Sequence, residues 1–292
     1  MKTMKNRTLF TKGACLVAAS LLTLAACKRD DSSSTSNSTP ANADDNGGYA
    51  SDAARMEINS DDVISIADAA GSTSSGSYLR TTATTATTIG GCATVHNDTS
   101  VTPHVLTINF GTTDCTCLDF KNRRGEIIVT YTGHYKDSGS THTITYNNYF
   151  VNDNQVGGSK TITNMGTNTS GQVYYNVTVN DSLTIASDSV ITWVGNRVRT
   201  WKDGYSTPER SDDVYLITGT TTLKRANGHT FTFDITTALQ VALDCPYIEA
   251  GIVNITGSSI AGTYTLNYGS GDCDDEAQLT IGSVTYNITL RL

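Results

Sequence analysis

The chain has 292 residues, with 28 acidic against 20 basic side chains and a formal net charge of −8. This balance argues against a nucleic-acid binder, because such proteins need clustered positive charge to displace counterions from phosphate. Threonine fills 48 positions and only 16% of residues are charged. Since threonine favours strands and Glu and Lys favour surface helices, the composition also argues against a mostly helical protein.

Residues 1–26 have the organisation of a secretory signal peptide. Basic side chains between residues 2 and 12 precede an apolar run at residues 16–26, which is shorter than the about 20 residues of a membrane-spanning helix. The run ends in Leu24-Ala25-Ala26-Cys27, which resembles the lipobox of bacterial lipoproteins. In that family the peptide is cut before the cysteine, so the resemblance implies that Cys27 is acylated and binds membrane lipid. An ordinary signal peptide with an incidental cysteine is the alternative.

The sequence after Cys27 bears on location. Residues 28–31 (Lys-Arg-Asp-Asp) resemble the signal that follows the lipidated cysteine in surface-exposed lipoproteins of the Bacteroidetes type. The segment 266–274 is also similar to lipoproteins of that group. These resemblances imply a lipid-anchored outer-membrane protein, with exposure at the cell surface as one option, and they imply no activity. A solvated tether with unselected charges is the alternative for residues 28–31.

Composition divides the next part of the chain into three segments. Residues 27–55 contain almost no large apolar side chains, so we expect a disordered tether, because such a segment cannot offset its ordering entropy. Residues 56–71 carry an apolar stripe at helical spacing, with Asp61 and Asp62 placed to favour a helix N-terminus; they predict one short helix. The Ser/Thr/Gly-rich residues 72–89 predict a low-complexity linker.

From residue 90 to residue 292 short alternating segments are separated by Gly, Asn and Asp, which indicates strands joined by turns. The early expected strands cover residues 105–110, 126–131, 141–150, 158–163, 173–179 and 189–194. Later turns are predicted at Gly195-Asn196, at Asn227-Gly228 between strands 214–224 and 229–236, and at Gly282-Ser283. No helical pattern intervenes, so we expect an all-β antiparallel domain, either a β-sandwich or an extended curved meander.

Five cysteines fall in the β domain: Cys92, Cys115, Cys117, Cys245 and Cys273. In an exported chain we expect disulfides, since export places thiols in an oxidising compartment. Cys245 and Cys273 form one expected pair, and Cys92 pairs with Cys115 or with Cys117, which leaves one cysteine free. A metal site is not expected, because Cys115-Thr-Cys117 has no second ligand pair at zinc spacing and no histidine cluster accompanies it.

Motifs for catalysis or cofactor binding are not found, and we expect no cofactor. The five histidines are scattered, and the sequence has no nucleophile elbow, phosphate loop or dinucleotide fingerprint. The acidic segment 272–276 reads as a solvated turn in which Asp274 or Asp275 binds backbone N–H groups. A Ca²⁺ site is the alternative reading of that segment.

Aromatic and basic residues near 200 form the candidate binding surface. With a turn at Gly195-Asn196, Trp201 shares a face with Arg197 and Arg199, where guanidinium groups can stack on the indole. Tyr205 follows closely and could extend a platform for a glycan or an envelope protein. A cation–π pair that only covers the sheet is the alternative.

These observations favour a membrane-anchored envelope lipoprotein with a non-catalytic, β-rich binding or structural domain. The alternative is a secreted-type hydrolase acting on envelope or environmental polymers such as glycans. A pocket that collects two or more carboxylates, or a Ser–His contact, favours the hydrolase. A flat sheet surface covered by Thr and Asn, without a cleft, favours the binding domain.

Overall fold

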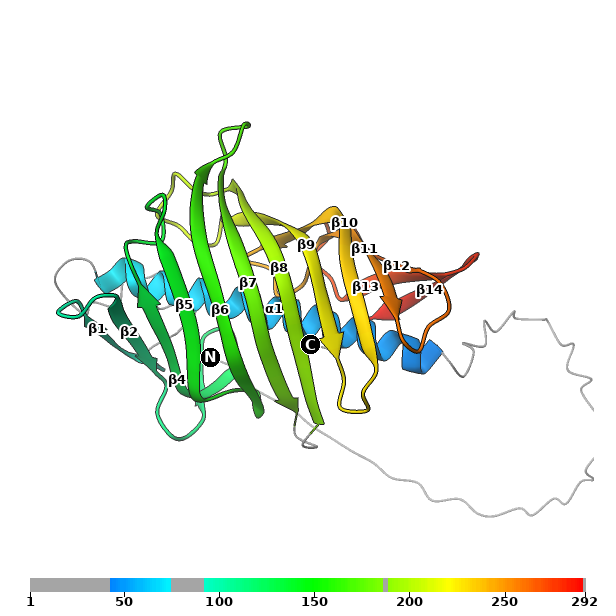
Figure 1. The fold of residues 1–292 in the computed structure, drawn as a ribbon, viewed down its shortest axis with the longest axis horizontal. Coiled ribbons are helices and arrows are strands. Elements are labelled where there is room, and N and C mark those ends of the chain that lie inside the picture. Colours follow the sequence, from blue (N-terminus) through cyan, green and yellow to red (C-terminus); the bar gives the residue numbers. More distant parts are fainter. Residues whose placement is uncertain (1–42, 75–91, 186–188, 291–292) are drawn as a thin grey trace, which may run out of the picture. The chain divides into compact units, whose positions relative to one another are not determined.

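The computed structural model describes residues 43–74, 92–185 and 189–290, which form one helix and fourteen strands (Figure 1). All of them belong to a single unit, Thr39–Leu292. The predicted signal peptide, Cys27, the first part of the predicted tether and the predicted linker beyond residue 74 lie outside the described residues.

The helix, α1 (Ala43–Ser74), is longer than predicted: it begins at Ala43 rather than at residue 56. The expectation of a disordered tether up to residue 55 is therefore wrong over its last part. Tyr49 explains the difference, because its ring stacks on Phe231 of the sheet with centroids 4.3 Å apart, and Ala50 is buried beside it. Helices in proteins gain most of their stability from such packing, which composition does not register. Among the described helical residues there is no stretch long and apolar enough to cross a membrane.

The strands form one antiparallel sheet. Their bounds are β1 (Thr94–Asp98), β2 (His104–Asn109), β3 (Cys115–Thr116), β4 (Asn122–Tyr131), β5 (Thr141–Val151), β6 (Asn154–Thr167), β7 (Val173–Ile185), β8 (Ser189–Asp203), β9 (Val214–Lys224), β10 (Thr230–Ala242), β11 (Ala250–Gly257), β12 (Tyr264–Ser270), β13 (Glu276–Ile281) and β14 (Val284–Thr289). Each strand pairs with the next in the chain, except that β2 pairs with β4 and the short β3 lies beside β4. The all-β antiparallel prediction is confirmed, and the architecture is the meander rather than the sandwich.

Two of the three predicted turns are confirmed. The Gly228 N–H donates to the Arg225 carbonyl oxygen at 2.9 Å and Gly228 has a φ of +84°, so Asn227-Gly228 turns β9 into β10. Ile281 pairs with Val284 across the second turn, which joins β13 to β14. Both glycines of these turns have the positive φ that glycine adopts without a steric penalty.

The third predicted turn, Gly195-Asn196, is wrong, because β8 continues through it. Asn196 is paired on both sides, with Thr178 of β7 and with Thr220 of β9. Gly195 serves a different purpose from a turn: a Cβ placed there would lie 2.3 Å from the Thr220 carbonyl oxygen. Glycine inside a strand often marks such a close backbone approach.

The two faces of the sheet differ in character. The helix face packs on α1 (Figure 1) and carries the buried aromatic side chains, among them Trp193, Tyr175 and Phe233. The outer face is polar. One unbroken row of paired residues crosses eleven strands of that face: Thr130, Thr143, Thr161, Thr178, Asn196, Thr220, Asp234, Asn254, Thr265, Thr280 and Thr285. Cross-strand pairs of this kind stabilise a sheet, which accounts for much of the threonine.

Two disulfides join cysteines of the described residues. Cys245 pairs with Cys273, as predicted, and Cys92 pairs with Cys115. Cys117 is the free member of the group and is buried. The sequence left the partner of Cys92 open, and the structure selects Cys115, which begins β3.

Candidate functional site

The predicted binding surface around Trp201 is wrong, because three of its four residues are buried. Trp201, Arg197 and Arg199 are each at most 5% exposed. Since β8 is continuous, Arg197, Arg199 and Trp201 lie on the same buried face as Trp193, whereas the predicted turn would have placed these three side chains on the opposite face. Tyr205 alone is exposed, and its ring meets that of Trp201 edge-on at 5.0 Å.

The buried arginines of β8 hold α1 against the sheet. Arg197 Nη2 lies 2.9 Å from a Glu57 carboxylate oxygen, and Arg199 Nε lies 3.3 Å from Asp61. The indole N–H of Trp201 donates to Asp213 at 3.1 Å. The two arginines therefore connect the helix to the sheet, and Trp201 binds the connection before β9, so none of the three faces a ligand.

Other carboxylates along α1 also form ion pairs with arginines of the sheet and its loops. Further pairs join Arg225 to Asp52, Arg123 to Asp62, and Arg210 to Asp68. The sequence assigned Asp61 and Asp62 to a helix N-terminus, and this assignment is wrong: both lie in the middle of α1. Their role is ion pairing with the sheet and its loops.

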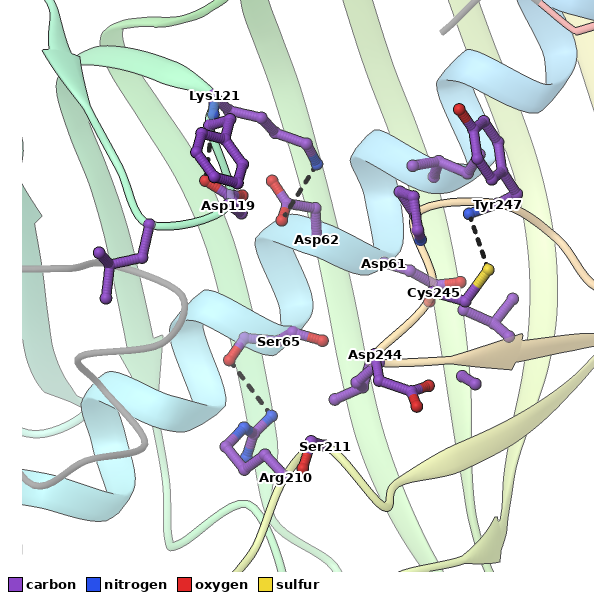
Figure 2. Close-up of a pocket in the computed structure, with 17 residues that line it drawn as sticks. Asp61, Asp62, Ser65, Asp119, Lys121, Arg210, Ser211, Asp244, Cys245 and Tyr247 are labelled. Carbon is purple, nitrogen blue, oxygen red and sulfur yellow. Dashed lines mark hydrogen bonds and ion pairs between the residues drawn. The ribbon is translucent and has the colours of Figure 1, made fainter. Parts of the chain in front are cut away.

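A pocket of about 490 Å³, here called the α1 pocket, opens beside these ion pairs. Its floor is α1, and its walls are two loops that reach α1 from opposite sides, as Figure 2 shows. The first, the rim loop, comprises residues 117–121 between β3 and β4; the second, the opposite loop, comprises residues 243–247 after β10. The lining residues are Ile58, Asp61, Asp62, Ser65, Leu118, Asp119, Phe120, Lys121, Arg210, Ser211, Val241, Ala242, Leu243, Asp244, Cys245, Pro246 and Tyr247.

The rim loop displays two apolar side chains to solvent. Phe120 is 87% exposed and Leu118 is 56% exposed. Phe120 also has a φ of +61°, which is uncommon for a bulky residue and is found where the surrounding structure enforces it. Arg123 provides this enforcement, because its two Nη atoms donate to the Asp119 carboxylate at 2.7 and 2.6 Å.

The opposite loop is fixed by covalent and backbone contacts. Cys245 is bonded to Cys273, and its N–H donates to the Ala242 carbonyl oxygen at 3.2 Å. The Leu243 N–H donates to the Asp213 carbonyl oxygen at 3.0 Å. Both walls of the α1 pocket are therefore set before a ligand arrives.

Most charged groups of the α1 pocket have partners within the protein. Asp62 lies 3.4 Å from Lys121 and 2.9 Å from Arg123. Burial acts to raise the pKa of Asp62, but these two cations outweigh burial and hold that pKa below its ordinary value. Burial raises the pKa of Asp61 to about 6, against the opposing effect of Arg199.

Three polar groups of the lining lack partners among the described residues. The Ser65 hydroxyl and the Asp61 Oδ2 atom are buried without a hydrogen bond. They lie four residues apart on α1 and therefore on the same side of the helix. Asp244 is exposed and forms no ion pair with the described part of the chain. Buried polar groups are usually hydrogen-bonded in folded proteins, so the Ser65 hydroxyl and Asp61 Oδ2 can accept a partner from a ligand.

Sequence reasoning did not find this pocket. Ser65, Phe120 and Asp244 are far apart in the chain and belong to no motif. The available signal was local: Leu118 and Phe120 are large apolar residues in a short connection between strands, where polar residues are usual. Over the residues that the structure describes, no three His, Cys, Asp or Glu side chains gather where they could hold a metal ion. In the acidic segment, Asp274 accepts a hydrogen bond from the Glu276 N–H at 2.9 Å, as predicted.

Comparison with protein-family models, with curated proteins and with solved structures finds no match for this chain. The function is therefore argued from the geometry of the site.

Proposed function

We propose that this protein is a lipid-anchored binding protein of the cell envelope, which captures an amphipathic ligand in the α1 pocket without transforming it. The ligand has an apolar body and a positively charged end. The observation that carries this proposal is the α1 pocket itself, with its exposed Phe120.

The size and lining of the pocket support binding of a small molecule or a short segment of chain. Ligand sites are typically clefts of about 300–1,000 Å³ lined mainly by apolar side chains with a few placed polar groups. The α1 pocket has about 490 Å³ and is lined by apolar residues from α1 and both loops, such as Ile58, Leu118 and Leu243. Phe120 at the rim can close over an apolar body, since exposed aromatic residues often dominate binding energy.

The charge pattern supports a cationic end. Lys121 and Arg210 are occupied by Asp62 and Asp68, so the lining has no cation to offer an anion. Asp244 is a carboxylate that pairs with no described residue, and the net charge of −8 attracts cations toward the protein. A protonated amine could therefore pair with Asp244, with Ser65 on the floor as a further acceptor.

The envelope location rests on the sequence. The lipobox at Leu24-Ala25-Ala26-Cys27 supports acylation of Cys27, and the two disulfides are consistent with a compartment outside the cytoplasm. A protein anchored through several acyl chains remains attached to the membrane while its folded domain faces water.

The test uses the full chain with Cys27→Ser, which removes the predicted acylation site, and two matched probes. 2-Naphthylmethylamine is charged at pH 7, and 2-naphthalenemethanol is its neutral counterpart. Calorimetry should show tighter binding of the amine. Phe120→Ala should weaken both probes about tenfold, and Asp244→Asn should weaken the amine alone about fivefold.

Val284→Ala provides the matched control, because Val284 is an exposed apolar residue on β14 outside the pocket. This variant should bind both probes as the parent chain does. Equal binding of the two probes would refute the cationic end, and an unchanged affinity in Phe120→Ala would refute the site.

The hydrolase is the second candidate, because the α1 pocket collects more than two carboxylates, the feature expected of a hydrolase. Asp61 and Asp62 both line the pocket and their pKa values move in opposite directions, a pattern found in acid–base pairs. Both carboxylates are held by arginines, however, which favours a structural role. Turnover of a glycoside, ester, peptide or phosphoester that is abolished by Asp62→Asn in a folded protein would replace the binding function.

A further inference from the structure

A second pocket, here called the His142 pocket, lies near the C-terminal end of α1 and has about 210 Å³. It shares no lining residue with the α1 pocket. Its apolar side is formed by Ala67 and Gly71 of α1 and Leu106 of β2. The remaining wall comes from the end of β4, the loop that follows it, and β5.

Aromatic rings form this wall and are held in fixed positions. The rings of Tyr131 and His142 are stacked, with centroids 5.6 Å apart and planes at 16°. The Tyr135 ring meets His142 edge-on at 5.5 Å and 76°. The Tyr131 hydroxyl donates to Asn97 at 2.7 Å, and the Tyr135 hydroxyl accepts from Arg199 at 3.1 Å. Both phenol groups are therefore engaged by the protein.

His142 presents a hydrogen-bonding atom that the protein does not use. Its Nε2 is buried and has no partner among the described residues. Because Nε2 has no hydrogen bond, the backbone hydrogen bonds of the imidazole with Gly133 and His134 are assigned to Nδ1. Burial lowers the pKa of His142, so the ring is neutral at pH 7. With the other nitrogen donating to backbone oxygens, Nε2 is an acceptor.

Charged groups at this pocket are committed elsewhere. Asp68 pairs with Arg210. Lys136 donates to the Tyr205 carbonyl oxygen at 2.9 Å and lies over the Trp201 ring at 4.6 Å. What remains for a ligand is a set of aromatic and apolar surfaces with one buried acceptor, since the other histidine of the lining, His134, is exposed.

We infer that the His142 pocket binds a flat, uncharged aromatic ring that carries one hydrogen-bond donor, with the donor directed at His142 Nε2. An apolar cavity of about 150 Å³ accommodates benzene, so about 210 Å³ leaves room for a ring with a small substituent. The Tyr131 and Tyr135 rings offer the edge and face contacts that aromatic ligands prefer. A ligand without a donor would leave Nε2 unpaired and should bind less tightly.

The experiment compares phenol with toluene, which has the same shape but no donor. Nuclear magnetic resonance of the full chain labelled with ¹⁵N-histidine follows the Nε2 resonance of His142 during titration. Phenol should shift this resonance toward the value of a hydrogen-bonded nitrogen, whereas toluene should not. Phenol should also bind about tenfold more tightly than toluene.

His142→Phe keeps an aromatic ring in the wall but removes the acceptor. It should weaken phenol binding about tenfold and leave toluene within twofold. His104→Phe is the matched control, because His104 contacts Tyr131 at 5.2 Å without lining the pocket, and it should change neither. Saturation by phenol without a shift at Nε2, equal affinity for the two probes, or no binding of either would overturn the inference. The titration of the unmodified chain decides the question even if His142→Phe does not fold.

Discussion

Glu57 gives a direct test of the ionic packing of α1. Its carboxylate accepts hydrogen bonds from Arg197 at 2.9 and 3.2 Å, and both side chains are buried. Glu57→Gln removes the negative charge and leaves the Arg197 guanidinium with neutral partners, the new carboxamide oxygen and the Thr221 hydroxyl at 2.6 Å. Breaking one side of a buried ion pair costs about 3–5 kcal/mol, because the other charge stays buried and uncompensated.

The assay is urea unfolding of the full chain at pH 7, followed by tryptophan fluorescence. Trp193 and Trp201 both lie on the helix face, so their emission reports detachment of α1. The free energy of unfolding should fall by about 3–5 kcal/mol, equivalent to roughly 10 °C in melting temperature for a domain of this size.

Two further variants test whether the loss comes from the uncompensated buried charge. Asp114→Asn is the matched control, since Asp114 pairs with Arg124 at a partly exposed site and should cost below about 1 kcal/mol. Combining Glu57→Met with Arg197→Met removes both charges and should recover most of the loss. A loss below about 1 kcal/mol in Glu57→Gln would refute the argument. So would a double variant whose loss in free energy of unfolding equals the summed losses of Glu57→Met alone and Arg197→Met alone.

Four other outcomes are expected. Because burial raises the pKa of Asp61 to about 6, its folded state binds a proton more tightly than its unfolded state. The free energy of unfolding of the parent chain should therefore fall relative to Asp61→Asn as the pH rises from about 4 to about 6, and a constant difference in urea unfolding would contradict this. Cys273→Ser opens the disulfide to Cys245 and should cost about 3–4 kcal/mol for a 28-residue separation; equal unfolding midpoints before and after reduction of the parent chain would contradict this. Gly195→Ala places a Cβ against the β9 backbone and should cost about 2 kcal/mol or more by denaturant unfolding, whereas a neutral effect would mean that the strands can separate there. Cys27→Ser should move the protein from the membrane to the soluble fraction after cell lysis, and its retention in the membrane would exclude the lipid anchor.

Strand positions could be predicted because they depend on local pattern. In β10 the side chains of Phe231, Phe233 and Ile235 alternate with polar residues and are all buried, and the turns on glycines 228 and 282 follow local backbone preferences. The turn predicted at Gly195-Asn196 failed because the same dipeptide is compatible with a strand when neighbours pair on both sides. The positions of β7 and β9 decide between the strand and the turn.

The helix start and the pocket could not be predicted, because each depends on contacts between distant segments. Residues 43–55 become helical through packing such as that of Tyr49 on Phe231, although their composition resembles a tether. The α1 pocket combines α1 with loops that follow β3 and β10. No residue spacing in the sequence indicates that these segments lie close together.

The ion pairs of α1 connect the fold to the proposed site through Arg123. This buried guanidinium binds Asp62 on the pocket floor and Asp119 in the rim loop. Sliding α1 by one turn, about 5.4 Å, would break the pair of Asp62 with Arg123 and the pair of Asp61 with Arg199. The helix position that allows both pairs therefore also fixes the place of Ser65 on the pocket floor. Buried ion pairs add little net stability compared with apolar packing, but they can specify one arrangement among several. In this protein the same arginine that fixes the helix register also holds the loop that exposes Phe120.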